Sequence, residues 1–152
     1  YPAARPSIQV LVSDGLNANA VNQNLRQVLP ALRHSLIQAG YSLGDKAIFI
    51  ENGRVRAGYH VGALLDVDLI IHLIGERPGT GLDQMSAYIT YRRAIAGTSR
   101  WSVDLDHSLT NAVCGINKRG KDHEIAVDEI VRLVQRAFSD KNSGVPVHSL
   151  QR

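Results

Sequence analysis

Short apolar runs that end in turn residues predict four strands along the chain. Three of them cover Ile8–Val12, residues 47–50 and residues 112–116. The fourth, residues 68–74, is apolar at almost every position, which favours a place at the centre of a sheet. A further strand is indicated at residues 87–92, where apolar and polar side chains alternate, so we expect this strand to be half exposed.

Apolar positions at helical spacing predict three helices between and after these strands. The first follows Asn17 and Asn19, both of which are suitable N-cap residues. Pro30 falls inside this helix, so we expect the helix to kink or split there. A short helix is predicted over residues 59–65, and a final amphipathic helix over residues 124–139.

The alternation of strands and helices favours an α/β architecture. The chain shows no internal repeat and no linker-like stretch, so residues 1–152 are expected to form a single domain. We predict a three-layer, Rossmann-like fold with a mostly parallel sheet between its helices. The segment 93–110, which lacks a regular pattern, is expected to be a long surface loop.

Composition excludes several classes of protein. With 152 residues, of which 44% are apolar and 20% charged, the chain can bury a core and is not a disordered polymer. A single cysteine excludes an intramolecular disulfide and a cysteine-rich zinc site. No apolar run is long enough to span a membrane. The net charge of +3 is not gathered into a basic stripe with aromatic residues, which argues against nucleic-acid binding.

The chain starts with Tyr1-Pro2-Ala3-Ala4-Arg5-Pro6, which has no initiator methionine and no apolar core of a secretory signal. We therefore expect that these residues belong to a longer protein or to a trimmed form of it.

Three loops that follow predicted strands combine glycine with a charged or polar side chain. They are Ser13-Asp14-Gly15, residues 52–55 and Gly75-Glu76-Arg77-Pro78-Gly79. In open α/β sheets, ligands bind outside the carboxyl ends of the strands. Glycine there lets a ligand approach the backbone closely. The second loop has an alternative interpretation, because residues 52–55 could begin a hairpin instead of ending a strand.

Known nucleotide and nucleophile motifs do not match this chain. Gly79-Thr80-Gly81 begins like a dinucleotide fingerprint, but Gln84 stands where the third glycine belongs, and no phosphate-binding P-loop sequence is present. Asp14 is the best isolated acid, yet capping of the turn that follows it explains this residue equally well. A hydrolase that uses Asp14 is thus one hypothesis.

The remaining reactive side chains also have structural explanations. Cys114 lies in an apolar strand and could be a small buried side chain, and His72 is expected to be a core or interface histidine. His107 and His123 are expected to be solvated, and no histidine has metal-ligand spacing to a carboxylate. Trp101 is predicted to anchor its loop or to lie at an interface. These residues do not identify a reaction by themselves.

Three segments taken together resemble a known family. They are Val12–Ala20 (VSDGLNANA), Gly53-Arg54-Val55 and Leu73–Gly79 (LIGERPG), in this order and at matching spacing. This pattern is similar to that of the small subunit of ethanolamine ammonia-lyase. The likeness is closest over residues 7–91, where Ser86 and Tyr88 also stand where the family has a serine and a tyrosine.

The resemblance implies an enzyme that converts ethanolamine to acetaldehyde and ammonia with adenosylcobalamin, whose cobalt–carbon bond breaks homolytically. It implies that the large subunit, a TIM barrel, holds the substrate and most catalytic groups, and that the small subunit covers the cofactor and is inactive alone. It also implies a cytoplasmic location, including the interior of a bacterial microcompartment.

The family's cofactor contacts fall on named positions of this chain. The resemblance assigns them to Val55, Glu76 and Cys114, with Arg54 as a weaker addition. Glu76 would accept hydrogen bonds from the amide side chains of the corrin ring, and Val55 and Cys114 would line its apolar edge.

The sequence also departs from the family pattern. Around Cys114 only the cysteine and Asn117 match, and the stretch between Tyr91 and Cys114 is longer than usual. Family members carry a long N-terminal extension that helps assembly, and we expect this chain to lack it. These departures leave an alternative function open, namely a divergent, non-catalytic module that binds cobalamin or acts as a scaffold.

Overall fold

The computed structural model describes residues 5–76 and 83–144. The elements follow one another in the order β1 (Ile8–Ser13), α1 (Ala18–Gln38), β2 (Ile48–Ile50), α2 (Val55–Leu65), β3 (Leu69–Gly75), β4 (Met85–Tyr91), a 3-10 turn (His107–Leu109), β5 (Thr110–Ile116) and α3 (His123–Asp140). The predicted strands and helices are all present, with bounds that shift by a few residues. The predicted hairpin alternative at residues 52–55 is wrong, because β2 leads directly into α2.

The five strands form one mixed sheet in the order β2-β1-β3-β4-β5. Strand β1 pairs in parallel with β2 and β3, whereas β4 pairs antiparallel with both β3 and β5. The α/β class is therefore confirmed, but the predicted mostly parallel, Rossmann-like sheet is not. The reason lies in the connections. Only the nine residues 76–84 join β3 to β4, too few for a crossover helix, and the described segment between β4 and β5 contains only a 3-10 turn, so both strands return antiparallel.

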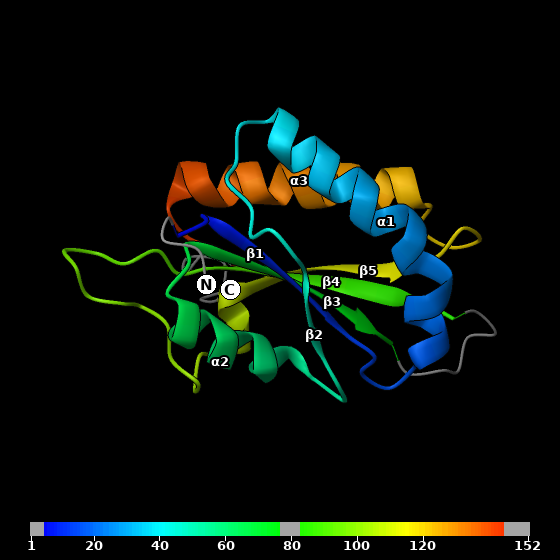
Figure 1. Cartoon of the computed structure of the whole chain (residues 1–152), viewed down its shortest axis with the longest axis horizontal. Helices are drawn as coiled ribbons and strands as arrows, with labels where there is room; N and C mark the ends of the chain where they lie inside the picture. Colours follow the sequence, from blue (N-terminus) through cyan, green and yellow to red (C-terminus); the bar gives the residue numbers. More distant parts are fainter. Residues whose placement is uncertain (1–4, 77–82, 145–152) are drawn as a thin grey trace, which may run out of the picture.

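Helices cover both faces of the sheet, so the prediction of three layers is confirmed. Figure 1 shows α1 and α3 on one face and α2 on the other. The larger core lies under α1 and α3, and includes Val10, Leu73 and Ile89. The smaller core lies under α2, where Leu11 and Ile70 meet the side chain of Trp101.

Helix α1 begins at the predicted cap, where the Asn17 side chain accepts a 3.2 Å hydrogen bond from the Ala20 amide. Pro30 does not split the helix. Because Pro30 has no amide hydrogen, the Arg26 carbonyl lacks its hydrogen-bond donor within the helix. Both residues are exposed, so water can donate to that carbonyl. Packing of buried residues such as Leu32 on the sheet holds the rest of the helix in place.

Strand β4 is more buried than the alternation of its residues predicts. Every residue of Met85–Tyr91 except Tyr88 is buried. The Thr90 hydroxyl forms a 2.7 Å hydrogen bond with that of Thr110 on β5, which in turn bonds to the Tyr59 hydroxyl of α2 at 2.8 Å. The expected half-exposed strand is thus wrong, because Ser86 and Thr90 are buried and only Tyr88 on that face stays half-buried.

His72 sits in the middle of β3 and is a core residue, as the sequence predicts, with 1% of its surface exposed. Its Nε2 and the Ser13 hydroxyl form a 2.6 Å hydrogen bond, while Nδ1 is buried without a partner among the described residues. Helix α2 covers the ring so closely that a Cβ at Gly58 would lie 3.0 Å from Nδ1. Burial lowers the pKa of His72 from 6.5 to about 4.

Three loops at the carboxyl end of the parallel strands pack directly on one another. A Cβ at Gly75 would overlap the carbonyl oxygen of Asn17 and lie 2.5 Å from that of Asp14. The Asp14 carboxylate accepts a 2.6 Å hydrogen bond from the Asn52 amide, which ties the first loop to the loop between β2 and α2. A Cβ at Gly53 would lie 2.5 Å from the Ser13 hydroxyl oxygen. The glycines of the three motifs therefore make the close approach of these loops sterically feasible.

In the part of the chain that the structure describes, no helix has both the length and the apolar character needed to cross a membrane.

The buried His72 makes folding stability depend on pH. Between pH 6.5 and 4 the unfolded chain takes up a proton at His72 that the folded chain does not bind. Above pH 6.5 His72 is neutral in both states, so the free energy of unfolding should not depend on its protonation. As the pH falls from 6.5 to 4, the free energy of unfolding is expected to decrease by up to about 3 kcal/mol. Urea unfolding at several pH values measures this loss. His72→Gln should flatten the dependence, and the exposed control His34→Gln should not; equal slopes in all three proteins would contradict the assignment.

Gly75→Ala should destabilise the fold by about 3 kcal/mol or more, because its Cβ would meet two backbone carbonyls that cannot move aside independently. The matched control is Gly40→Ala, at a position with φ +94° and open space around it, where only backbone strain of about 1 kcal/mol is expected. Denaturant unfolding of both variants measures the difference. Equal losses would show that steric contact at Gly75 does not matter.

Candidate functional site

The face of the sheet that carries α2 is covered only in part. Helix α2 and Trp101 cover β1 and β3, but over β4 and β5 no helix of the described chain lies on this face. Tyr88 is half-buried there, and its neighbours Ala112 and Cys114 on β5 are exposed. This open face, together with the three loops at the carboxyl ends of the parallel strands, is the candidate site.

A cavity of about 310 Å³ lies where the start of α2 meets this open face. Its wall is formed by Val55, Tyr88, His107, Thr110 and Ala112. Val55 is the first residue of α2, and the loop contacts of Gly53 and Asn52 fix where the helix begins. The cavity is largely apolar, with hydroxyl and imidazole groups at its sides, which suits an amphipathic ligand.

The polar groups at one side of the cavity form a connected network. The Tyr59 hydroxyl bonds to His107 Nδ1 at 2.9 Å and to the Thr110 hydroxyl at 2.8 Å. His107 is exposed, as predicted, and its bond to Tyr59 holds the ring at the cavity wall. Burial raises the pKa of Tyr59 above its usual 10.0, so its hydroxyl stays protonated at neutral pH.

Glu76 enters the site from the end of β3. Its backbone amide donates to the Gln84 carbonyl at 2.9 Å, and its Oε1 accepts a 3.1 Å hydrogen bond from the Tyr88 hydroxyl. Burial, the Glu76 carboxylate and the nearby Cys114 raise the pKa of Tyr88 to about 12. Tyr88 is therefore a permanent donor that orients the Glu76 carboxylate. The second oxygen, Oε2, accepts no hydrogen bond from the described residues and can serve a ligand.

Cys114 lies on the open face of β5, close enough to Tyr88 to affect its pKa. Its side chain is exposed and its thiol is free, so the alternative of a small buried residue is wrong. The physical reason is that β5 is an edge strand whose α2-side face has no helix over it. The next residue, Gly115, has φ +72°, in a stretch where the pairing with β4 shifts register between Met85 and Ala87.

Arg54 is the N-cap residue of α2 and is exposed. Its guanidinium donates a long 3.5 Å bond to the Asn52 carbonyl and does not line the cavity. The structure therefore brings Val55, Glu76 and Cys114 together around Tyr88, whereas Arg54 stays at the rim of the loop.

The other candidates from the sequence have structural roles away from the cavity. Asp14 accepts a bond from the neighbouring loop instead of capping its own turn with its side chain. His123 is half-buried, not solvated, because its Nε2 forms a 2.8 Å bond with Asn24 Oδ1. Trp101 anchors its loop as predicted: its indole donates to the Val67 carbonyl at 2.7 Å, and it packs directly on Gly62. Residues 79–81, with their partial nucleotide motif, lie outside the described residues.

Sequence reasoning missed Tyr88 as the centre of the site, along with Thr110 and Ala112. A signal was present, since Tyr88 is the aromatic residue on the polar side of an alternating strand and matches a family tyrosine. Its bond to Glu76 depends on the antiparallel return of β4, which the sequence pattern did not predict.

The described residues contain no group of three or more histidine, cysteine, aspartate or glutamate side chains that could hold a metal ion.

One solved structure shows a partial likeness. The crystal structure of lipoprotein GNA1162 from Neisseria meningitidis aligns with 86% of this chain and 96% of its own chain, at 11% identity and a TM-score of 0.37. A score this low supports no statement about fold or function.

The comparison with protein families gives a clear result. A family model described as "Ethanolamine ammonia-lyase light chain (EutC)" matches residues 2–148, which is nearly the whole chain and includes all three sequence motifs. The chain therefore belongs to the light-chain family of ethanolamine ammonia-lyase, a lyase, as the motifs around Asp14, Val55 and Glu76 predict.

Proposed function

We propose that this chain is the small subunit of an adenosylcobalamin-dependent ethanolamine ammonia-lyase and that its open sheet face covers part of the cofactor. The family of light chains implies a larger partner subunit. The substrate, ethanolamine, and most of the catalytic groups belong to that partner in this proposal. When bound, adenosylcobalamin supplies the radical chemistry that the side chains of this chain cannot supply.

One observation carries the proposal. Three residues that the family resemblance assigns to the cofactor come from three separate segments, and each of them meets Tyr88. Val55 shares the cavity with Tyr88, Glu76 accepts its hydrogen bond at 3.1 Å, and Cys114 is near enough to raise its pKa. Residues with only structural roles would not be expected to gather on the least covered face of the sheet.

The chemistry of these groups suits the edge of a corrin ring. A corrinoid presents amide side chains that donate hydrogen bonds and a large apolar periphery. The Glu76 carboxylate, held by Tyr88 and with Oε2 still available, can accept from an amide. Val55, Ala112 and the Cys114 side chain offer apolar contact. Arg54, at the rim of the loop, is placed to meet a group at the outer edge of the ligand or of the partner.

The size of the cavity supports a shared site. At about 310 Å³ the cavity can take a side chain of the cofactor or one edge of it, and not a whole corrinoid. The rest of the cofactor must then be enclosed by another surface, which the large subunit would provide. This is why we expect the isolated chain to have no lyase activity.

Reconstitution tests the proposal as a whole. The chain, extended to full length where a longer form exists, is mixed with the large subunit, adenosylcobalamin and ethanolamine, and ammonia release is measured. Activity is expected only with both subunits. Stable binding of cobalamin without ammonia release would instead favour the divergent, non-catalytic module, and the absence of any complex with the large subunit would contradict the proposal.

Glu76→Gln should weaken cobalamin retention by the complex without unfolding the chain. The lost charge-assisted hydrogen bond is expected to cost about 1.5–3 kcal/mol, which is roughly a 10- to 150-fold increase in Kd. Spectrophotometric titration of cobalamin measures it. The control is Glu124→Gln, which removes an exposed carboxylate from the α3 layer on the other face of the sheet. Unchanged affinity in the Glu76 variant would exclude this role.

Tyr88→Phe should also weaken retention, although Tyr88 acts by orienting Glu76. We expect a loss of about fivefold to tenfold in affinity, since the hydrogen bond that orients the carboxylate disappears while the carboxylate itself remains. In the double variant with Glu76→Gln, the two effects should not add, because both act on the same hydrogen bond to the ligand. Additive losses would show that Tyr88 contacts the cofactor independently of Glu76.

A further inference from the structure

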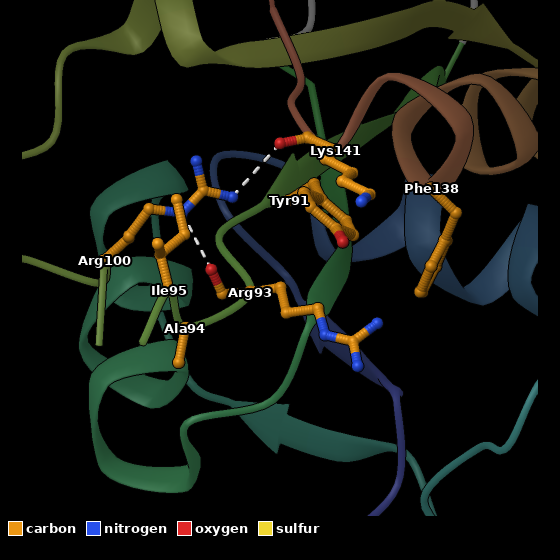
Figure 2. Close-up of a pocket in the computed structure, with 7 residues that line it drawn as sticks. All are labelled: Tyr91, Arg93, Ala94, Ile95, Arg100, Phe138 and Lys141. Carbon is orange, nitrogen blue, oxygen red and sulfur yellow. Dashed lines mark hydrogen bonds between the residues drawn. The ribbon is translucent and has the colours of Figure 1, made fainter. Parts of the chain in front are cut away.

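A second cavity of about 470 Å³ lies at the opposite edge of the sheet from Glu76. It is built from Tyr91 at the end of β4, the segment that follows, and the end of α3 at Phe138 and Lys141 (Figure 2). Tyr91 pairs with Leu69 at the start of β3, whereas Met85 pairs with Gly75 at its end. Tyr88, which lines the first cavity, and Tyr91 are three residues apart on β4, so their side chains leave opposite faces of the sheet and the two cavities lie on opposite faces.

The wall of this second cavity carries more positive than negative charge. Arg93, Arg100 and Lys141 line it, and no carboxylate is among the described residues that do. Arg93 has one loose ion pair, at 4.0 Å from Asp68, and its side chain is 63% exposed. Three cations around an apolar floor favour a negatively charged occupant.

Arg100 covers the backbone carbonyls that would otherwise repel an anion. Its Nε donates to the Arg93 carbonyl at 2.7 Å and an Nη donates to the Lys141 carbonyl at 3.2 Å, as the dashed lines in Figure 2 show. Its guanidinium carbon lies 5.9 Å from the centre of the Tyr91 ring. Arg100 thus fixes the shape of the cavity, while Arg93 and Lys141 keep their charged ends for a ligand.

Tyr91 supplies the independent observation. Only 1% of its surface is exposed, and its hydroxyl forms no hydrogen bond with any described residue. The hydroxyl oxygen is not among the fully buried side-chain atoms that lack a partner, so it reaches the surface of the cavity and can donate to a ligand there. In Figure 2 this hydroxyl lies between the ammonium group of Lys141 and the guanidinium group of Arg93, on the side of the cavity that faces Phe138. The hydroxyl is therefore a donor directed at the place where an anion would be held by two cations.

We propose that this cavity binds a small organic anion: a carboxylate or phosphate group attached to an aromatic or other flat apolar body. The anionic group accepts a hydrogen bond from the Tyr91 hydroxyl and pairs with Arg93 and Lys141. The apolar body packs against Phe138 and Ile95. The volume suits a ligand of about the size of a substituted benzene ring with its charged group.

Four simple probes test the ligand class on the full chain by isothermal titration and by ¹H–¹⁵N NMR. Phenyl phosphate or benzoate is expected to bind with a Kd of about 1 mM or below, and the tighter of the two identifies the anionic group. Benzyl alcohol, which lacks the charge, and inorganic phosphate, which lacks the ring, should each bind at least about tenfold more weakly. If neither aromatic anion binds, or if benzyl alcohol or inorganic phosphate binds as tightly, the proposal is wrong.

Substitutions place the binding in the cavity. Tyr91→Phe and Arg93→Gln should each raise the Kd of the bound probe about tenfold. Arg132→Gln, an exposed arginine on α3 outside the cavity, should leave it unchanged. Tyr91→Phe should not lower the melting temperature, because the hydroxyl has no hydrogen bond to lose. Weaker binding by this variant would therefore not result from unfolding. Equal affinity in the three variants would overturn the site. No cobalamin is used, so the outcome does not depend on the function proposed above.

Discussion

The contact between Gly75 and the backbone of the loop after β1 is the constraint on which the site depends. Two carbonyl oxygens, from Asp14 and Asn17, occupy the space where any side chain at Gly75 would begin. The end of β3 and the start of α1 must therefore keep one relative position, and the Asp14 bond to Asn52 extends that rigidity to the start of α2. Val55 and Glu76 flank these contacts, so their separation is set by backbone packing and not by flexible side chains. This explains why the three motifs occur together although they are far apart in the sequence.

The antiparallel half of the sheet has a functional consequence. Had β4 and β5 continued the parallel pattern, each would have needed a crossover connection, usually a helix packed on one face of the sheet. Because they return without such helices, Tyr88, Ala112 and Cys114 stay uncovered on the α2 side. The departure from the predicted sheet thus creates the open surface that a light chain needs if a partner is to complete its site. An uncovered edge strand is otherwise a liability for a folded protein.

The sequence predicts the elements of this fold well and their spatial relations poorly. Apolar periodicity locates every strand and helix, since the burial that causes the periodicity is local to each element. The direction of β4 and the exposure of Cys114 depend on what covers each face, which is information spread over the whole chain. The motifs did point to Val55 and Glu76, because glycines required by close loop packing leave a sequence signature. Tyr88 was missed as the centre of the site, because its hydrogen bond to Glu76 exists only once β4 folds back on β3.

Strand β4 connects the two cavities, and its geometry argues that they act independently. Tyr88 and Tyr91 are an odd number of positions apart, so their side chains leave opposite faces of the sheet. The hydroxyl of Tyr88 is satisfied by Glu76, whereas that of Tyr91 has no partner among the described residues. Both residues pair with β3 on one side. On the other side Tyr88 pairs with Ala112 of β5, and the Tyr91 amide donates to the hydroxyl of Ser143, which follows α3. A ligand at Tyr91 would fill a preformed space without moving the strand, so it should leave the position of Tyr88 and Glu76 unchanged. Coupling between the two would require β4 to shift register, which the buried residues on both of its faces oppose.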